Sequence, residues 1–64
     1  IDKIVFWRLR ETPALTQLVT LCSKIAANVL IEGIETERDR TCALHAGARF
    51  GQGYYWPSWR WQED

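Results

Sequence analysis

Residues 28–33 read Asn-Val-Leu-Ile-Glu-Gly, and this stretch decides the fold class. The run from Asn28 to Ile31 is β-prone and does not alternate polar with apolar residues, which is typical of a strand buried on both faces of a sheet. Strands of this kind occur mainly in parallel sheets, and Gly33 marks the end of the run. We therefore predict a buried parallel strand over residues 28–32.

A helix is predicted on the N-terminal side of this strand, over residues 13–27. Apolar residues recur there at the i, i+3, i+4 and i+7 spacing that forms one apolar helix face. Thr12 is placed to cap the free backbone N–H groups of the first turn, and Pro13 suits the first helical position. The opening residues 1–7 are interpreted as the end of a strand that runs into a loop or a helical turn.

A second helix and a further strand are predicted on the C-terminal side. Thr36 is placed to cap a helix over residues 37–46, and Gly47 stands where a left-handed C-terminal cap is expected. The apolar side of this helix carries small residues, which would let it lie close to a sheet. Residues 48–55 are predicted to form the next strand, which Pro57 ends because proline has no N–H to donate.

The predicted order is strand end, helix, strand, helix, strand, which is a βαβαβ stretch of the α/β class with adjacent parallel strands. Periodicity leaves open whether the sheet is open and doubly wound or closed into a barrel. The chain has 64 residues, fewer than the roughly 100–150 of a typical domain. We therefore expect residues outside the chain to complete the fold.

Composition narrows the choice of partners and of compartment. Eight basic and eight acidic residues cancel, so the chain has no positive field that would attract nucleic acid polymers or anionic membranes. Its apolar runs are far shorter than the ~20 residues of a membrane span, so we expect no membrane contact. Cys22 and Cys42 show no disulfide-framework spacing, which favours a reduced, cytoplasmic location. The tryptophan-rich stretch 56–61 is interpreted as cover for an apolar surface of the domain or of a neighbouring chain, with stacking on a base as the alternative.

Two groups of residues could carry chemistry. Glu32 and Glu35 lie at the C-terminal end of the predicted strand, where α/β proteins place catalytic groups because the loops converge there. The alternative is that Glu35 belongs to the acidic first turn of the next helix and that Glu32 is a solvated loop charge. Gln52 stands between Gly51 and Gly53, so a ligand could approach the backbone while the carboxamide donates and accepts hydrogen bonds. The alternative there is a strand bulge with an ordinary polar residue.

Both groups belong to longer motifs that follow each other in a recognisable order. Residues 28–37 read Asn-Val-Leu-Ile-Glu-Gly-Ile-Glu-Thr-Glu, residues 45–48 read His-Ala-Gly-Ala, and residues 52–55 read Gln-Gly-Tyr-Tyr. Over nearly all of residues 1–57 the chain resembles the last third of the EAL family of cyclic-di-GMP phosphodiesterases. That family typically carries Glu-Gly-Val-Glu-Thr on its seventh barrel strand and Gln-Gly-Tyr or Gln-Gly-Phe on its eighth. Ile1-Asp2 resembles the end of its sixth-strand Lys-Ile-Asp motif, whose catalytic lysine would precede Ile1.

The resemblance implies a fold, an activity and a role for each candidate residue. The fold would be a modified, TIM-like (β/α)8 barrel, with residues 1–64 as the C-terminal segment of a single domain. The activity would be that of a bacterial signalling hydrolase that converts cyclic-di-GMP to linear pGpG with two magnesium or manganese ions. Glu32 matches a catalytic ligand of the second metal, and Glu35 matches a supporting catalytic acid; carboxylate oxygens suit such ions. Gln52 and Gly53 match the substrate-binding part of the eighth strand.

The implied partners are cyclic-di-GMP, the rest of the EAL domain and, as an open alternative, a second copy in a homodimer. The other metal ligands, the paired aspartates and the lysine of the family belong to earlier strands, so the 64 residues alone are not expected to be active. A degenerate EAL module, which binds cyclic-di-GMP or a protein partner without catalysis, is the alternative function. An unrelated βαβ interaction fragment is a third reading. A lysine directly before Ile1, with paired aspartates upstream, would support the enzyme.

Overall fold

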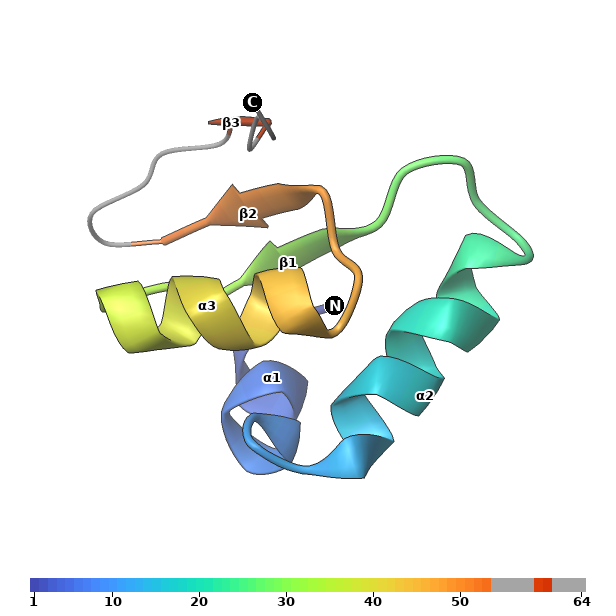
Figure 1. Ribbon diagram of the computed structural model, residues 1–64. Coiled ribbons are helices and arrows are strands. Elements are labelled where there is room, and N and C mark those ends of the chain that lie inside the picture. The colour runs from blue at the N-terminus through green and yellow to red at the C-terminus, as the bar shows by residue number, and fades with distance from the viewer. Residues whose placement is uncertain (54–58, 61–64) are drawn as a thin grey trace.

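The computed structural model describes residues 1–53 and 59–60 (Figure 1). The helices are α1 (Lys3–Leu9), α2 (Pro13–Ser23) and α3 (Glu37–His45), and the strands are β1 (Leu30–Glu32), β2 (Phe50–Gln52) and β3 (Trp59–Arg60). The chain order of these elements is α1, α2, β1, α3, β2, β3. A mixed helix and strand architecture of the α/β class is therefore confirmed.

The described strands form one sheet in the order β1-β2-β3. β1 and β2 are parallel neighbours, and the residues Leu30–Glu32 lie in register opposite Phe50–Gln52. Helix α3 provides the crossover that a parallel pair requires. The predicted parallel and adjacent arrangement of these two strands is confirmed.

Both strands are shorter than predicted. β1 begins at Leu30 rather than at residue 28, because residues 24–29 are used to bring the chain from the end of α2 back to the sheet. β2 begins at Phe50 rather than at residue 48, and its last strand residue is Gln52; the predicted continuation over residues 54–55 lies outside the described residues. β3 was not predicted. Its backbone pairs antiparallel with β2 along the edge opposite β1.

Ile1 lies along the free edge of β1. Its terminal nitrogen donates to the carbonyl oxygen of Leu30 at 2.7 Å, and the N–H of Glu32 donates to the carbonyl oxygen of Ile1 at 2.9 Å. A parallel ladder makes this pair of bonds around one residue of the neighbouring strand, here Ile31. Ile1 is therefore hydrogen-bonded to β1 in the same way as the last residue of a neighbouring parallel strand would be. Asp2 then caps α1 through its side chain.

Helix α2 has an N-terminus as predicted and an earlier end than predicted. Pro13 occupies its first turn, but the Thr12 hydroxyl donates to the Leu9 carbonyl instead of capping the helix. The helix ends at Ser23, not at residue 27, and Ile25 is 82% exposed. Sequence spacing could not show this, because the apolar pattern runs on through the residues that return to the sheet. With 11 residues α2 is the longest helix described, and no helix in the described part of the chain is long and apolar enough to cross a membrane.

Helix α3 forms almost as predicted. The Thr36 hydroxyl accepts the N–H of Asp39 at 3.0 Å, and Glu37 and Asp39 lie in the first turn. Gly47 follows the C-cap with a φ of +101°, a left-handed conformation that glycine adopts without strain. The predicted helix over residues 37–46 is observed over Glu37–His45, with Ala46 as its C-cap.

The helices and the two parallel strands enclose one small apolar core. In Figure 1 the three helices lie on one side of β1 and β2. Phe6 from α1, Ile31 from β1 and Ile34 from the following loop are fully buried. The rest of the buried cluster comes from the other helices and their ends: Leu15, Val19, Ala43, Ala46 and Ala48. On α3 the buried apolar residue is Ala43, and its C-cap Ala46 is also buried.

Candidate active site

β1 and β2 end side by side at one edge of the sheet. Glu32 and Gln52 are the last residues of their strands and lie opposite each other in the parallel register. Side chains that are paired in this way point to the same face of the sheet. Residues from two separate motifs are therefore neighbours because β1 and β2 pair in parallel and in this register.

Hydrogen bonds from β2 hold the loop that follows β1. The carbonyl oxygen of Gln52 accepts the N–H of Gly33 at 2.9 Å and the N–H of Ile34 at 3.1 Å. Gly33 has a φ of +91°, which favours glycine. Gly53 packs directly on the backbone of Ile34, where a Cβ atom would overlap the carbonyl group. Glycine at position 53 therefore has a packing reason that does not depend on a ligand.

The four candidate residues line one cavity of ≈ 390 Å³. Its lining residues are Lys3, Trp7, Glu32, Gly33, Glu35, Gln52 and Gly53. Glu32, Glu35 and Gln52 are exposed, and Gly53 is half-buried. The structure thus brings together the two motifs that the sequence places apart, at the C-terminal edge of the parallel strands.

Several side-chain oxygens that can act as metal ligands line the cavity. They belong to the Glu32 and Glu35 carboxylates, which are its acidic groups, and to the carboxamide of Gln52. Such groups suit Mg²⁺ or Mn²⁺. Within residues 1–53 and 59–60, no three His, Cys, Asp or Glu side chains gather where they could hold a metal ion. Among the described residues that line the cavity, Glu32, Glu35 and Gln52 are those whose side-chain oxygens could bind a metal ion.

Sequence reasoning missed two residues of this cavity, Lys3 and Trp7. The Trp7 indole N–H donates to the carbonyl oxygen of Gly33 at 3.0 Å, and the Lys3 ammonium lies 5.8 Å from the centre of the Trp7 ring. Both residues belong to α1, which was predicted only as a loop or helical turn. Their position in the sequence could have predicted this placement. Helix α1 directly follows the strand end at Ile1, so it starts at the same edge of the sheet.

The buried carboxylate of Asp39 hydrogen-bonds to the loop that carries Glu35. Asp39, only 4% exposed, accepts the Glu35 N–H at 3.1 Å and the Arg10 guanidinium at 2.8 Å. Its own N–H donates to Thr36. Asp39 lies in the first turn of α3. The sequence pattern does not show that this carboxylate also joins α1, α3 and the loop that carries Glu35.

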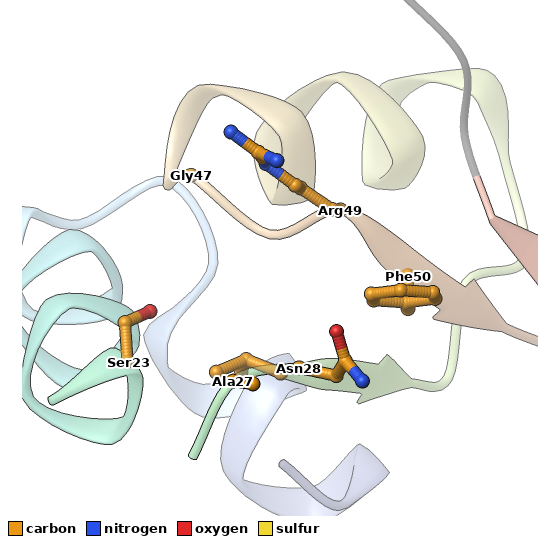
Figure 2. A pocket seen from close by; sticks show the side chains of 7 residues that line it. Ser23, Ala27, Asn28, Gly47, Arg49 and Phe50 are labelled. Atoms are coloured by element: carbon orange, nitrogen blue, oxygen red, sulfur yellow. The ribbon is translucent and has the colours of Figure 1, made fainter. Parts of the chain in front are cut away.

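A second cavity, of ≈ 400 Å³, lies at the opposite end of the strands (Figure 2). It is lined by Ser23, Ala27, Asn28, Val29, Gly47, Arg49 and Phe50. In Figure 2 the Asn28 carboxamide and the Phe50 ring lie on the strand side of this cavity, and Ser23 lies on the helix side. No carboxylate lines this cavity, and it lies where the strands begin, so the candidate active site is the cavity at the strands' C-terminal ends.

Comparison with known proteins identifies no family for this chain, since no family model, no curated protein and no solved structure matches it.

Proposed function

We propose that this chain is the C-terminal segment of an EAL-type domain that hydrolyses cyclic-di-GMP to linear pGpG. The observation that carries the proposal is the cavity at the ends of β1 and β2. The resemblance assigns roles to Glu32, Glu35, Gln52 and Gly53, and all four line this cavity. The two motifs meet at the C-terminal edge of the parallel strands, which is where α/β proteins place catalytic groups.

The arrangement of the strands supports a barrel segment. Ile1, β1 and β2 are neighbours in chain order, with parallel hydrogen bonding throughout. Successive strands of a (β/α)8 barrel are neighbours in the same way. In a closed barrel the outer edge of β2 would pair with the first barrel strand, whereas here it pairs with β3. The proposal therefore requires β3 to leave this edge when the barrel closes.

Each cavity residue has a defined task in the proposed reaction. Two Mg²⁺ or Mn²⁺ ions, when bound, would activate a water and neutralise the phosphodiester for in-line attack. Glu32 would supply carboxylate oxygens to one ion, and Glu35 would add negative charge beside it. Gln52 would bind the substrate with its carboxamide, which can donate and accept at once. The remaining ligands and the lysine would belong to strands that precede Ile1.

A degenerate EAL module that binds cyclic-di-GMP or a protein partner without turnover is the second candidate function. Its supporting observation is that the cavity brings two carboxylates and a carboxamide together, and such polar groups can also bind a ligand without turnover. The enzyme is preferred because both Glu32 and Gln52 are intact, whereas a module released from catalysis would be expected to lose them.

Hydrolysis of cyclic-di-GMP by the complete domain, measured against Mn²⁺ and Mg²⁺ concentration, tests the proposal. Glu32→Gln keeps the side-chain size and removes the charge, so metal-dependent turnover should fall by about 100-fold or more. Gln52→Ala should weaken substrate binding more than it changes the metal dependence. Glu37→Gln is the matched control, because Glu37 is exposed on α3 and lies outside the cavity.

Each outcome has a separate meaning. An inactive parent domain that still binds the dinucleotide would favour the non-catalytic module. A parent domain that neither binds nor hydrolyses it would refute the enzyme and the dinucleotide-binding form of the second candidate. Equal metal dependence in Glu32→Gln and Glu37→Gln would remove the metal role from Glu32.

A further inference from the structure

Trp7 presents an aromatic ring to the candidate cavity in a fixed orientation. Its indole N–H donates to the carbonyl oxygen of Gly33 at 3.0 Å, so the ring is held against the loop that follows β1. Trp7 is half-buried and lines the cavity together with Glu32 and Gln52. A ring that is positioned before a ligand arrives loses little conformational entropy on binding.

Lys3 places a positive charge beside this ring. It lies one helical turn before Trp7 on α1, is exposed, and holds its ammonium 5.8 Å from the ring centre. This distance is near the outer limit of a cation–π contact. An anionic group that entered the cavity would draw the ammonium away and uncover the ring.

Close packing ties these two side chains to the acidic loop. A Cβ atom on Gly33 would lie 2.7 Å from Cβ of Lys3 and 2.8 Å from Nε1 of Trp7. Helix α1 therefore rests directly on the glycine that follows Glu32. As a result, the Trp7 ring and the backbone that carries Lys3 keep their positions relative to the loop that follows β1.

We propose that Trp7 and Lys3 bind a purine nucleotide in this cavity, with the base stacked on the indole and the phosphate paired with the ammonium. The inference rests on the proposed function and deepens it, because it assigns two substrate-binding residues outside the recognised motifs. A cavity of ≈ 390 Å³ falls in the size range of small-ligand sites. Its polar groups match the ligand: the ammonium suits a phosphate, and the Gln52 carboxamide suits the edge of a base.

Binding without turnover is the direct test. Calorimetric titrations of the complete domain with cyclic-di-GMP and with GMP, in buffer containing a metal chelator, measure affinity separately from hydrolysis. Trp7→Leu removes the ring and should weaken both ligands roughly 5- to 150-fold, which is the range found for loss of one stacked base. Trp7→Phe keeps a ring and should retain more of the affinity than Trp7→Leu.

Lys3→Gln should weaken both ligands and reduce the salt dependence of the dissociation constant, because one phosphate contact is lost. Arg8→Gln is the matched control, since Arg8 is exposed on the same helix and does not line the cavity. Lys3 is also exposed, so Lys3→Gln tests the inference even if Trp7→Leu fails to fold.

The two proposals fail in different ways. One result would overturn this inference and leave the proposed function standing. In that result Lys3→Gln and Trp7→Phe bind cyclic-di-GMP as tightly as the parent domain does, and Trp7→Leu is either unchanged in affinity or unfolded. A domain that binds GMP through Trp7 and Lys3 but does not bind cyclic-di-GMP would overturn the proposed function alone. Absence of binding to either nucleotide would overturn this inference, and the metal-dependent hydrolysis assay would then decide the proposed function separately.

Discussion

Adding a methyl group at Gly33 should destabilise the fold more than adding one at Gly47, although both glycines have a positive φ. Their φ angles are +91° and +101°, so alanine is strained at either position, by about 1–3 kcal/mol. Their surroundings differ. A Cβ at Gly47 would meet only Cγ1 of Val19 at 3.7 Å, which is ordinary van der Waals contact.

At Gly33 the new atom would lie within 2.8 Å of both α1 side chains described above and 3.2 Å from Cα of Lys3. Because backbone as well as side-chain atoms are in the way, helix α1 would have to move. Forcing extra volume into a packed contact costs about 1–3 kcal/mol. The free energy of unfolding should therefore fall by about 1–3 kcal/mol more in Gly33→Ala than in Gly47→Ala.

Urea unfolding of Gly33→Ala and Gly47→Ala, followed by far-UV circular dichroism, gives the free energy of unfolding of each variant. The NMR signal of the Trp7 indole N–H gives a local readout, because this group donates to Gly33. The signal should shift in Gly33→Ala and stay in place in Gly47→Ala. Equal destabilisation of the two variants, or an unmoved indole signal in Gly33→Ala, would refute the argument that α1 rests on the loop.

Two further predictions concern the support of the site. Asp39→Ala should lower the free energy of unfolding by about 2 kcal/mol, because it removes the acceptor for the Glu35 N–H and the Arg10 guanidinium. The loss is limited because Arg10 is 38% exposed, so water can solvate part of its charge. Hydrogen exchange at the Glu35 amide should accelerate. Arg38→Ala removes only a surface ion pair and should cost less than about 1 kcal/mol by the same urea titration, so equal losses would contradict the role of Asp39. Ile31→Ala empties a fully buried position and should cost about 2–5 kcal/mol; a loss below 1 kcal/mol would show that the core is not packed as described.

Much of the fold could be predicted because its signals are local. The cap at Thr36 and the left-handed glycine at 47 place α3 to within one residue. The β-prone run before Gly33 identifies β1, although not its first residue. The end of α2 could not be predicted, since Ile25 and Ala26 continue the apolar spacing and only the path back to the sheet removes them from the helix.

The candidate site also combines features that the sequence shows with features that only the tertiary structure shows. The sequence by itself determined which groups are available: two carboxylates after one strand and a carboxamide between glycines at the end of the next, in motifs that resemble one family. The tertiary structure alone decided that these groups line one cavity, because strand register depends on pairing across the sheet. It also decided that α1 brings Lys3 and Trp7 to that cavity and that Asp39 is buried beneath it. Such contacts join residues far apart in the chain, so no local pattern records them, and they form only when the core around Phe6 and Ile31 packs.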